Sequence, residues 1–210
     1  TVNRPERYEF NKHVSIMLTD IQNRRLNINQ RVLKSLLSTR ENKNRQRILT
    51  SAPYVHYNQF GTRTGRLTTK PNTFPILTIS KGLRTAVEPV NDFFIELDFN
   101  GAEVRTLLGL LEKDQPNEDV HTFHLREVFH NLSTREQAKV AFFAWLYGSK
   151  NAANSNESAR LASFYEKDKL LDKYWVDGDI KTCYGKKIKD VSEHHALNYI
   201  VQSTAAELTL

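Results

Sequence analysis

The stretch FFIELDFNGAEVRTLLGLLEKD, residues 93–114, decides the fold that the sequence predicts. Residues 93–97 are mostly apolar, with two aromatic side chains and one β-branched side chain, which predicts a short buried strand. Asp98 follows directly. Asn100 is then placed to cap a helix, with Glu103 reaching back to the cap, and apolar residues recur at helical spacing beyond it. The stretch therefore predicts a carboxylate fixed where a strand gives way to a helix.

Two interpretations of Asp98 follow from this position. A carboxylate that is held by rigid elements and opens to a crevice is suited to bind a hard, oxygen-seeking cation such as Mg²⁺. The alternative is an acid that only caps a turn. The stretch by itself leaves both interpretations open.

Composition narrows the class of protein. The chain has 210 residues, 39% of them hydrophobic, and no apolar run approaches membrane-spanning length, so no membrane partner is expected. Thirty Lys and Arg against 24 Asp and Glu give a net charge of +6, which favours a polyanionic partner but also occurs in proteins that bind no nucleic acid. Cys183 is the only cysteine, which excludes an internal disulfide and a cysteine-based zinc site.

The N-terminal part is rich in basic residues. Residues 13–49 predict two helices joined near residues 27–29, with a surface that is either a solvated helical face or a phosphate-binding face. The basic residues there are Arg24, Arg25, Arg31, Lys34, Arg40, Lys43, Arg45 and Arg47.

Residues 54–72 differ in character. Alternation at 54–57 predicts a strand, and glycines and threonines then alternate with Arg63, Arg66 and Lys70. Hydroxyls, glycines and cations at this spacing can bind a sugar-phosphate backbone, although a polar hairpin would have a similar sequence. A further strand is predicted between residues 77 and 89.

A helix from 134 to 147 carries the second informative pattern. Ser133 or Thr134 can cap it, and Gly148 is placed to end it. Four residues spaced four apart lie along one stripe of this helix, namely Arg135, Lys139, Phe143 and Tyr147. Two cations followed by two aromatics would present charge to a polyphosphate and flat rings to a base or sugar. The alternative is that the aromatics belong to the core and the cations are solvated.

The remaining segments predict mixed structure. Residues 152–175 predict one or two helices, residues 178–190 a hairpin with a glycine turn, and residues 197–210 a helix. His121, His124 and His130 fall close together, but no nearby cysteine completes a metal-ligand set, and a histidine that donates to a phosphate is equally consistent.

Five segments, in order, resemble the family A DNA polymerases, the group typified by bacterial DNA polymerase I. TGRLTTKPN resembles that family's TGRLSS…PN segment, LDFNGAEVR its DYSQIELR metal motif, and DVHT its DIHT. REQAKVAFFAWLYG resembles the family's finger helix, and NYIVQSTAAE its NxPxQGTAAD. Together these matches cover most of residues 54–207.

The resemblance implies an α+β fold, in which an antiparallel-sheet palm carries an inserted helical fingers subdomain and a short helical thumb remnant. It assigns residues 1–53 to the thumb, 54–118 to the first part of the palm, 119–180 to the fingers and 181–210 to the return to the palm. It implies template-directed DNA synthesis from dNTP on primer-template DNA, with accessory proteins of replication as further candidate partners. The expected location is the cytoplasm of a bacterium or of a virus-infected host cell, or an organelle.

The resemblance also assigns roles to residues. Asp98 and the carbonyl of Phe99 would be ligands of two Mg²⁺ ions, Glu103 would be the steric gate against ribonucleotides, and Lys139 would also protonate the leaving pyrophosphate. Nucleotide-binding residues would be Arg135, Lys139, Phe143, Tyr147, Glu103 and His121. DNA-binding residues would be Arg66, Asn72, Arg105, Asn198 and Gln202.

The sequence also departs from the family pattern. Phe142 and Ala144 replace the usual Asn and Gly of the finger helix, and Gly101 replaces a Gln of the metal motif. The family's second metal carboxylate belongs to a His-Asp-Glu segment that would follow residue 210. We therefore expect the sequence to be an excerpt of a longer protein that extends primers poorly by itself. The competing hypothesis is a non-catalytic DNA-binding relative of the polymerases.

Overall fold

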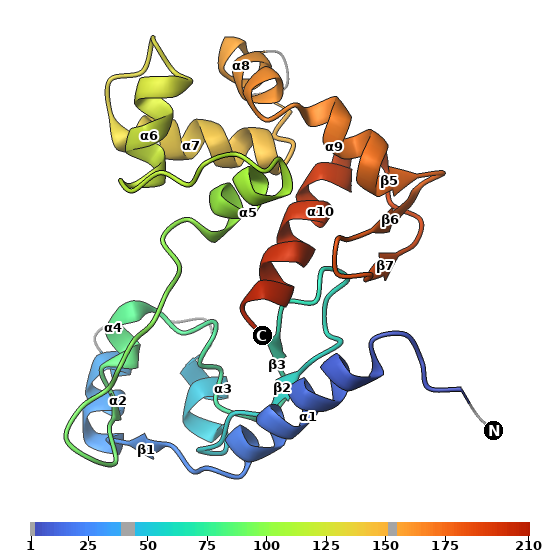
Figure 1. Cartoon of the computed structure of the whole chain (residues 1–210). Coiled ribbons are helices and arrows are strands. Elements are labelled where there is room, and N and C mark those ends of the chain that lie inside the picture. The colour runs from blue at the N-terminus through green and yellow to red at the C-terminus, as the bar shows by residue number, and fades with distance from the viewer. Residues whose placement is uncertain (1–2, 39–44, 151–154) are drawn as a thin grey trace. The chain divides into compact units, whose positions relative to one another are not determined.

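A computed structural model describes residues 3–38, 45–150 and 155–210 (Figure 1). The fold is α+β, with more helix than strand and with short antiparallel sheets. The chain divides into two compact units, Thr1–Leu97 and Asp98–Leu210, and each unit has its own hydrophobic core. Within the described residues, no helix is both long and apolar enough to span a membrane.

The first unit alternates short helices with two-residue strands. Its elements are, in chain order, α1 (Tyr8–Gln22), β1 (Asn27–Ile28), α2 (Gln30–Ser38), α3 (Arg45–Thr50), β2 (Tyr57–Asn58), β3 (Thr68–Thr69), α4 (Lys81–Arg84) and β4 (Val87–Glu88). Strand β1 pairs antiparallel with β4, and β2 pairs antiparallel with β3. The core of this unit consists of Leu33, Leu37, Ile48, Phe74, Ile79, Leu83 and Ala86.

Helices α1 and α2 confirm two helices joined near residues 27–29, but α1 begins earlier than predicted, at Tyr8, and α3 is a third helix that was not predicted. The predicted strand at 54–57 is wrong in its bounds, because pairing begins only at Tyr57. The strand predicted between 77 and 89 is reduced to β4, because α4 occupies the preceding residues. Of the predicted basic residues, Arg40, Lys43 and the side chain of Arg45 lie outside the described part of the chain.

The second unit is mainly helical. Its elements are α5 (Ala102–Leu110), α6 (Val120–Glu127), α7 (Arg135–Leu146), α8 (Asn156–Phe164), α9 (Lys167–Tyr174), β5 (Trp175–Val176), β6 (Asp179–Lys181), β7 (Lys187–Ile188) and α10 (Glu193–Leu208). Helix α10 packs against α5, α9 and β6, and α6 packs against α7 (Figure 1). Strands β5, β6 and β7 form an antiparallel sheet in that order, which confirms the hairpin predicted at 178–190.

Helix α7 begins where the sequence predicts. The Thr134 hydroxyl accepts from the backbone N–H of Gln137 at 3.3 Å, and the Gln137 side chain accepts from the backbone N–H of Thr134 at 3.2 Å. This capping box satisfies N–H groups that have no partner inside the helix. At the other end, Gly148 adopts a left-handed conformation (φ 67°), which favours glycine and ends the helix.

The predicted buried strand at 93–97 is wrong. These residues form no helix and belong to none of the sheets of the described chain, and Phe93, Ile95 and Leu97 are 69%, 75% and 91% exposed. Apolar composition favours a strand only where a neighbouring strand supplies hydrogen bonds and a core covers one face. Both conditions are tertiary, and the described residues provide neither for this segment.

The predicted capping box at the start of α5 is also wrong. The N-cap is Gly101, in a left-handed conformation (φ 67°), and no side chain caps the helix. Asn100 instead offers its backbone carbonyl to Arg105 Nε at 2.8 Å. Glu103 lies half-buried in the first turn.

A buried hydrogen bond joins α6 to the end of α8. His124 Nε2 lies 2.6 Å from the hydroxyl of Tyr165, and both side chains are fully buried. The ring of Phe142 stacks on His124, with a centroid distance of 5.1 Å. Burial lowers the pKa of His124 to about 3 and raises the pKa of Tyr165, so both groups are uncharged at neutral pH.

The His124 pair predicts a loss of stability in mild acid. The pKa of His124 is about 3 in the folded chain and about 6.5 in the unfolded chain. Below pH 6.5, His124 is therefore protonated in the unfolded chain but remains neutral in the folded chain. We expect this residue to lower the free energy of unfolding by about 2 kcal/mol between about pH 7 and pH 5. The pKa of Asp119 is lowered from 3.8, so its titration contributes nothing in this range.

The matched variant is His124→Phe/Tyr165→Phe, which removes both polar partners together and leaves neither group unpaired. Urea unfolding of this variant should show a weaker dependence on pH between about pH 7 and pH 5. Part of the dependence remains, because burial also lowers the pKa of His121. An unchanged pH profile in the double variant would contradict the assignment.

Candidate functional site on helices α6 and α7

The four-residue stripe of α7 lies away from the buried face of that helix. The buried face consists of Ala138, Phe142, Trp145 and Leu146. On the stripe, the rings of Phe143 and Tyr147 stack at a centroid distance of 5.7 Å with 17° between their planes. Tyr147 is 43% exposed and Phe143 half-buried. The aromatics of the stripe therefore form a partly exposed stacked pair, and only Phe143 also packs against the core.

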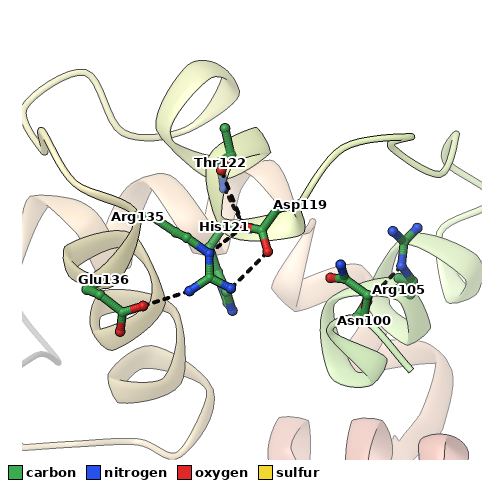
Figure 2. A network of polar contacts seen from close by, with 7 residues as sticks. All are labelled: Asn100, Arg105, Asp119, His121, Thr122, Arg135 and Glu136. Atoms are coloured by element: carbon green, nitrogen blue, oxygen red, sulfur yellow. Dashed lines mark hydrogen bonds and ion pairs between the residues drawn. The ribbon is translucent and has the colours of Figure 1, made fainter. Parts of the chain in front are cut away.

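Asp119 connects the first turn of α6 to the first turn of α7 (Figure 2). Its Oδ1 accepts from the backbone N–H groups of His121 and Thr122, both at 3.0 Å, so it is the N-cap of α6. The same carboxylate accepts from Arg135 Nε at 3.0 Å through Oδ1 and from Nη2 at 2.9 Å through Oδ2. This is a bidentate pair, the strongest common geometry between arginine and a carboxylate. Asp119 was not among the predicted site residues. An aspartate directly before a helix is nevertheless a typical N-cap, and this signal could have identified it.

The two cations of the stripe differ in their ion pairs with carboxylates. The Arg135 guanidinium beside Asp119 holds the pKa of that carboxyl well below its usual range, and Arg135 also donates to Glu136 at 2.7 Å. Lys139 is half-buried and makes no hydrogen bond or ion pair with the described residues. Lys139 is therefore the cation of the stripe whose charge is not matched by an adjacent carboxylate.

His121 lies beneath the stripe. It is only 4% exposed, and its ring is 5.9 Å from that of Phe143 and 6.0 Å from that of Phe142. Burial lowers its pKa, and the positive charges of Arg135 and Lys139 act in the same direction, against the opposing effect of Asp119. The buried Nδ1 has no hydrogen-bond partner in the described structure. The predicted contact of His121 with phosphates would require this ring to become more exposed.

The turn that precedes α5 lies directly against α6. A Cβ atom added to Gly101 would come within 2.4 Å of Val120 Cγ2, and the left-handed conformation of Gly101 also favours glycine. This contact explains why glycine occupies the position at which the resembled family has Gln. It also places Gly101 beside Val120, the first residue of α6. Asp98 is exposed, and so is Phe99.

The other predicted residues have varied surroundings. Arg105 donates to the carbonyls of Asn100 at 2.8 Å and Pro116 at 3.1 Å, so its guanidinium fastens two loops of its own unit. Asn198 and Gln202 lie one turn apart on α10, and Asn198 is 8% exposed with no partner for Nδ2 among the described residues.

Two predicted DNA-binding residues belong to the first unit. Arg66 is exposed in the loop between β2 and β3, and Asn72 is exposed just after β3 in a left-handed conformation (φ 62°). The described contacts therefore bring together Asp119, His121, Arg135, Phe143 and Tyr147, and none of these contacts includes Asp98.

The described residues do not fit a pair of Mg²⁺ ions without further ligands. Within residues 3–38, 45–150 and 155–210, no three His, Cys, Asp or Glu side chains are grouped so that they could hold a metal ion. Asp98 supplies a single carboxylate, whereas two ions that bridge a transferring phosphate need shared carboxylate ligands.

Two variants of Asp119 should separate its capping role from its ion pair. Asp119→Ala removes both and should lower the free energy of unfolding by about 2 kcal/mol, whereas Asp119→Asn keeps a capping oxygen and should cost about 1 kcal/mol or less. Urea unfolding at neutral pH measures the difference. Glu136→Gln, at the exposed second partner of Arg135, is the control and should change stability little. Equal losses in the two Asp119 variants would show that the cap contributes nothing.

No protein-family model matches the chain, and no curated protein matches it significantly. The family resemblance therefore rests on the five sequence segments, and the function that it implies is treated as a proposal.

Proposed function

We propose that the chain is part of a template-directed DNA polymerase that transfers a nucleotide from dNTP to a primer 3′-hydroxyl. The observation that carries this proposal is the face formed by α6 and α7. There a lysine without a paired carboxylate, an oriented arginine and a stacked aromatic pair follow one another along a single helix. These groups are complementary to the phosphates, sugar and base of one nucleotide.

The two cations of the stripe have different tasks in this proposal. Lys139 makes the first contact with the triphosphate, because its ammonium is not matched by an adjacent carboxylate. Arg135 already donates to Asp119 through Nε and Nη2 and to Glu136 through Nη1, so it would contact the triphosphate only with its remaining N–H groups. An arginine oriented in this way loses little freedom on binding a phosphate.

The proposed reaction joins the primer 3′-oxygen to the α-phosphorus and breaks the bond between that phosphorus and the bridging oxygen of pyrophosphate. The 3′-hydroxyl loses its proton to water. Lys139 then donates a proton to the leaving pyrophosphate. The Phe143–Tyr147 pair holds the sugar and base by stacking. Mg²⁺ would neutralise charge on the transferring group, and Asp98 is the described residue that is suited to be one of its ligands. A second carboxylate would have to come from elsewhere in a longer chain.

We also propose the division into palm, fingers and thumb. It rests on the sequence resemblance of residues 54–118 and 181–210, because residues 93–97 form no strand in the described chain. We propose the same division as the resemblance implies, with fingers at 119–180, palm at 54–118 and 181–210, and a thumb remnant at 1–53. Helices α6 to α9 would then be the fingers.

The second candidate function is a non-catalytic DNA-binding relative. The single carboxylate among the predicted metal ligands favours it, because one acid binds a metal pair weakly. A third candidate, a polymerase that makes or copies RNA, is favoured if Glu103→Ala leaves ribonucleotide discrimination unchanged.

Binding of nucleotide to the chain tests the stripe directly. Lys139→Ala should weaken binding of both dATP and inorganic tripolyphosphate by at least about tenfold, since a hydrogen bond between charged groups is worth about 1.5–3 kcal/mol. Phe143→Leu should weaken dATP binding and leave tripolyphosphate unchanged. Isothermal titration calorimetry measures both ligands. Lys139→Arg should retain most of the affinity, and Lys169→Ala is the control, because Lys169 lies on α9 and pairs with Glu166. Equal affinities of Lys139→Ala and wild type would refute the assignment.

Primer extension separates the enzyme from the non-catalytic relative. We expect these 210 residues to extend a gapped DNA poorly, and a longer chain that supplies a second carboxylate to extend it readily. In that longer chain, Asp98→Ala should reduce the extension rate by a factor of about 10³ or more, as expected for loss of a charge-stabilising group in catalysis. Asp92→Ala removes another exposed acid from the same segment and should be active. An active Asp98→Ala variant would favour the non-metal role of Asp98 in a turn.

A further inference from the structure

The first unit has a net positive charge, whereas the second unit has a small net negative charge. Residues 1–97 contain 16 Lys and Arg against 7 Asp and Glu, a net charge of +9, whereas residues 98–210 contain 14 against 17, a net charge of −3. Within the first unit, the sequence from Glu41 to Glu88 contains no acidic residue between these two. The β2–β3 hairpin lies in the middle of this acid-free stretch. Its surroundings in sequence are therefore suited to a polyanion.

The loop of this hairpin exposes one large aromatic side chain. Phe60, two residues beyond β2, is 75% exposed, the largest exposed fraction of any aromatic residue in the described chain. Arg63, Arg66 and Lys70 are exposed at the same hairpin. An exposed phenyl ring costs hydration free energy, so its position next to several cations is informative.

The residues on both sides of Phe60 are tightly held. Asn58 Oδ1 accepts from the backbone N–H of Phe60 at 3.1 Å, and Gln59 Nε2 donates to the backbone carbonyl of Asn11 on α1 at 3.4 Å. A Cβ atom added to Gly61 would come within 2.1 Å of Thr68 Oγ1 and 3.2 Å of Asn58 Nδ2. The backbone around Phe60 thus packs closely against its own hairpin while the ring points away from it.

The far side of the loop is closed by two further hydrogen bonds. Thr62 Oγ1 donates to the carbonyl of Arg66 at 2.9 Å, and the N–H of Gly65 donates to the carbonyl of Thr62 at 3.3 Å. Gly65 has a left-handed conformation (φ 87°), which allows this tight turn. A loop fixed at both ends presents its aromatic ring without a large loss of conformational entropy on binding.

We propose that Phe60 is a stacking platform for an unpaired base of single-stranded nucleic acid, with Arg66 and Lys70 binding the adjacent phosphates. Non-specific binding to single strands combines cations that follow the backbone with aromatic rings on which bases stack, and this loop offers both. The lack of acidic residues in the sequence around the hairpin favours a nucleic acid over a protein partner. The inference goes beyond nucleotidyl transfer, and it holds equally for a non-catalytic DNA-binding relative.

A substitution series on the intact chain tests this platform. Phe60→Ala and Phe60→Leu should weaken binding of a fluorescent single-stranded thymidine oligonucleotide by about tenfold, while Phe60→Tyr and Phe60→Trp should retain it within about twofold. Ile16→Ala is the control, because it removes another exposed apolar side chain, on α1 of the same unit, and should leave the affinity unchanged. Circular dichroism checks that each variant is folded.

Three further measurements identify the interaction. Wild-type protein should quench 2-aminopurine placed in the single strand, and Phe60→Ala should not. Binding of a blunt duplex of the same length should be unaffected by Phe60→Ala, because its bases are already paired. Arg66→Ala should reduce the slope of log affinity against log salt by about one, whereas Phe60→Ala should leave the slope unchanged.

The proposal is overturned if Phe60→Ala binds the single strand as tightly as wild type. It is equally overturned if the loss is the same on duplex, or if Phe60 is needed for binding to anionic lipid vesicles and not to the oligonucleotide. These experiments use neither nucleotide nor metal. Failure of primer extension or of dATP binding would therefore contradict the proposed function without changing the result for Phe60.

Discussion

The bond between Asp119 and Arg135 is the contact on which the candidate site depends. One carboxylate caps α6 and at the same time fixes the guanidinium at the start of α7, so the two helix starts cannot shift independently without losing hydrogen bonds. His121, two residues after the cap, is thereby held against Phe143, and the stacked pair continues along α7. The side chains that face the proposed nucleotide are thus ordered by a single anionic group.

Local patterns predicted helix α7 well, whereas contacts between distant residues could not be predicted. The capping residue of α7 and the glycine at its end follow from residues within a few positions of each other. In contrast, the close contact of Gly101 is with Val120, which lies on another helix, and the hydrogen bond of His124 reaches a tyrosine 41 residues away. Periodicity contains no information about such contacts.

The failed strand prediction has the same origin. Residues 93–97 have the composition of a buried strand, but composition specifies only that such a segment is stable when paired and covered. The described residues supply no partner strand, and the side chains are exposed. The predicted site residues had different outcomes. The α7 stripe and its histidine are in contact in the structure, whereas the role of the acid at position 98 depends on ligands that the described residues do not contain.

The division of charge between the two units gives each a separate chemical character. The unit that carries the α6–α7 face has a slight excess of acids, so an anionic ligand would be attracted there by individual cations and not by the net charge of the unit. The unit that carries the β2–β3 hairpin is strongly basic, with a net charge of +9 over residues 1–97, and such a charge favours an anionic polymer as the proposed partner.

The segment at 93–97 has a practical consequence for handling the protein. Phe93 and Phe94 are 69% and 62% exposed in backbone that belongs to no sheet of the described chain, and the boundary between the two units follows at Leu97. A protease that cleaves after aromatic residues would find an accessible substrate there, and brief digestion would release two fragments of nearly equal size. The same residues would make the purified chain prone to self-association at high concentration.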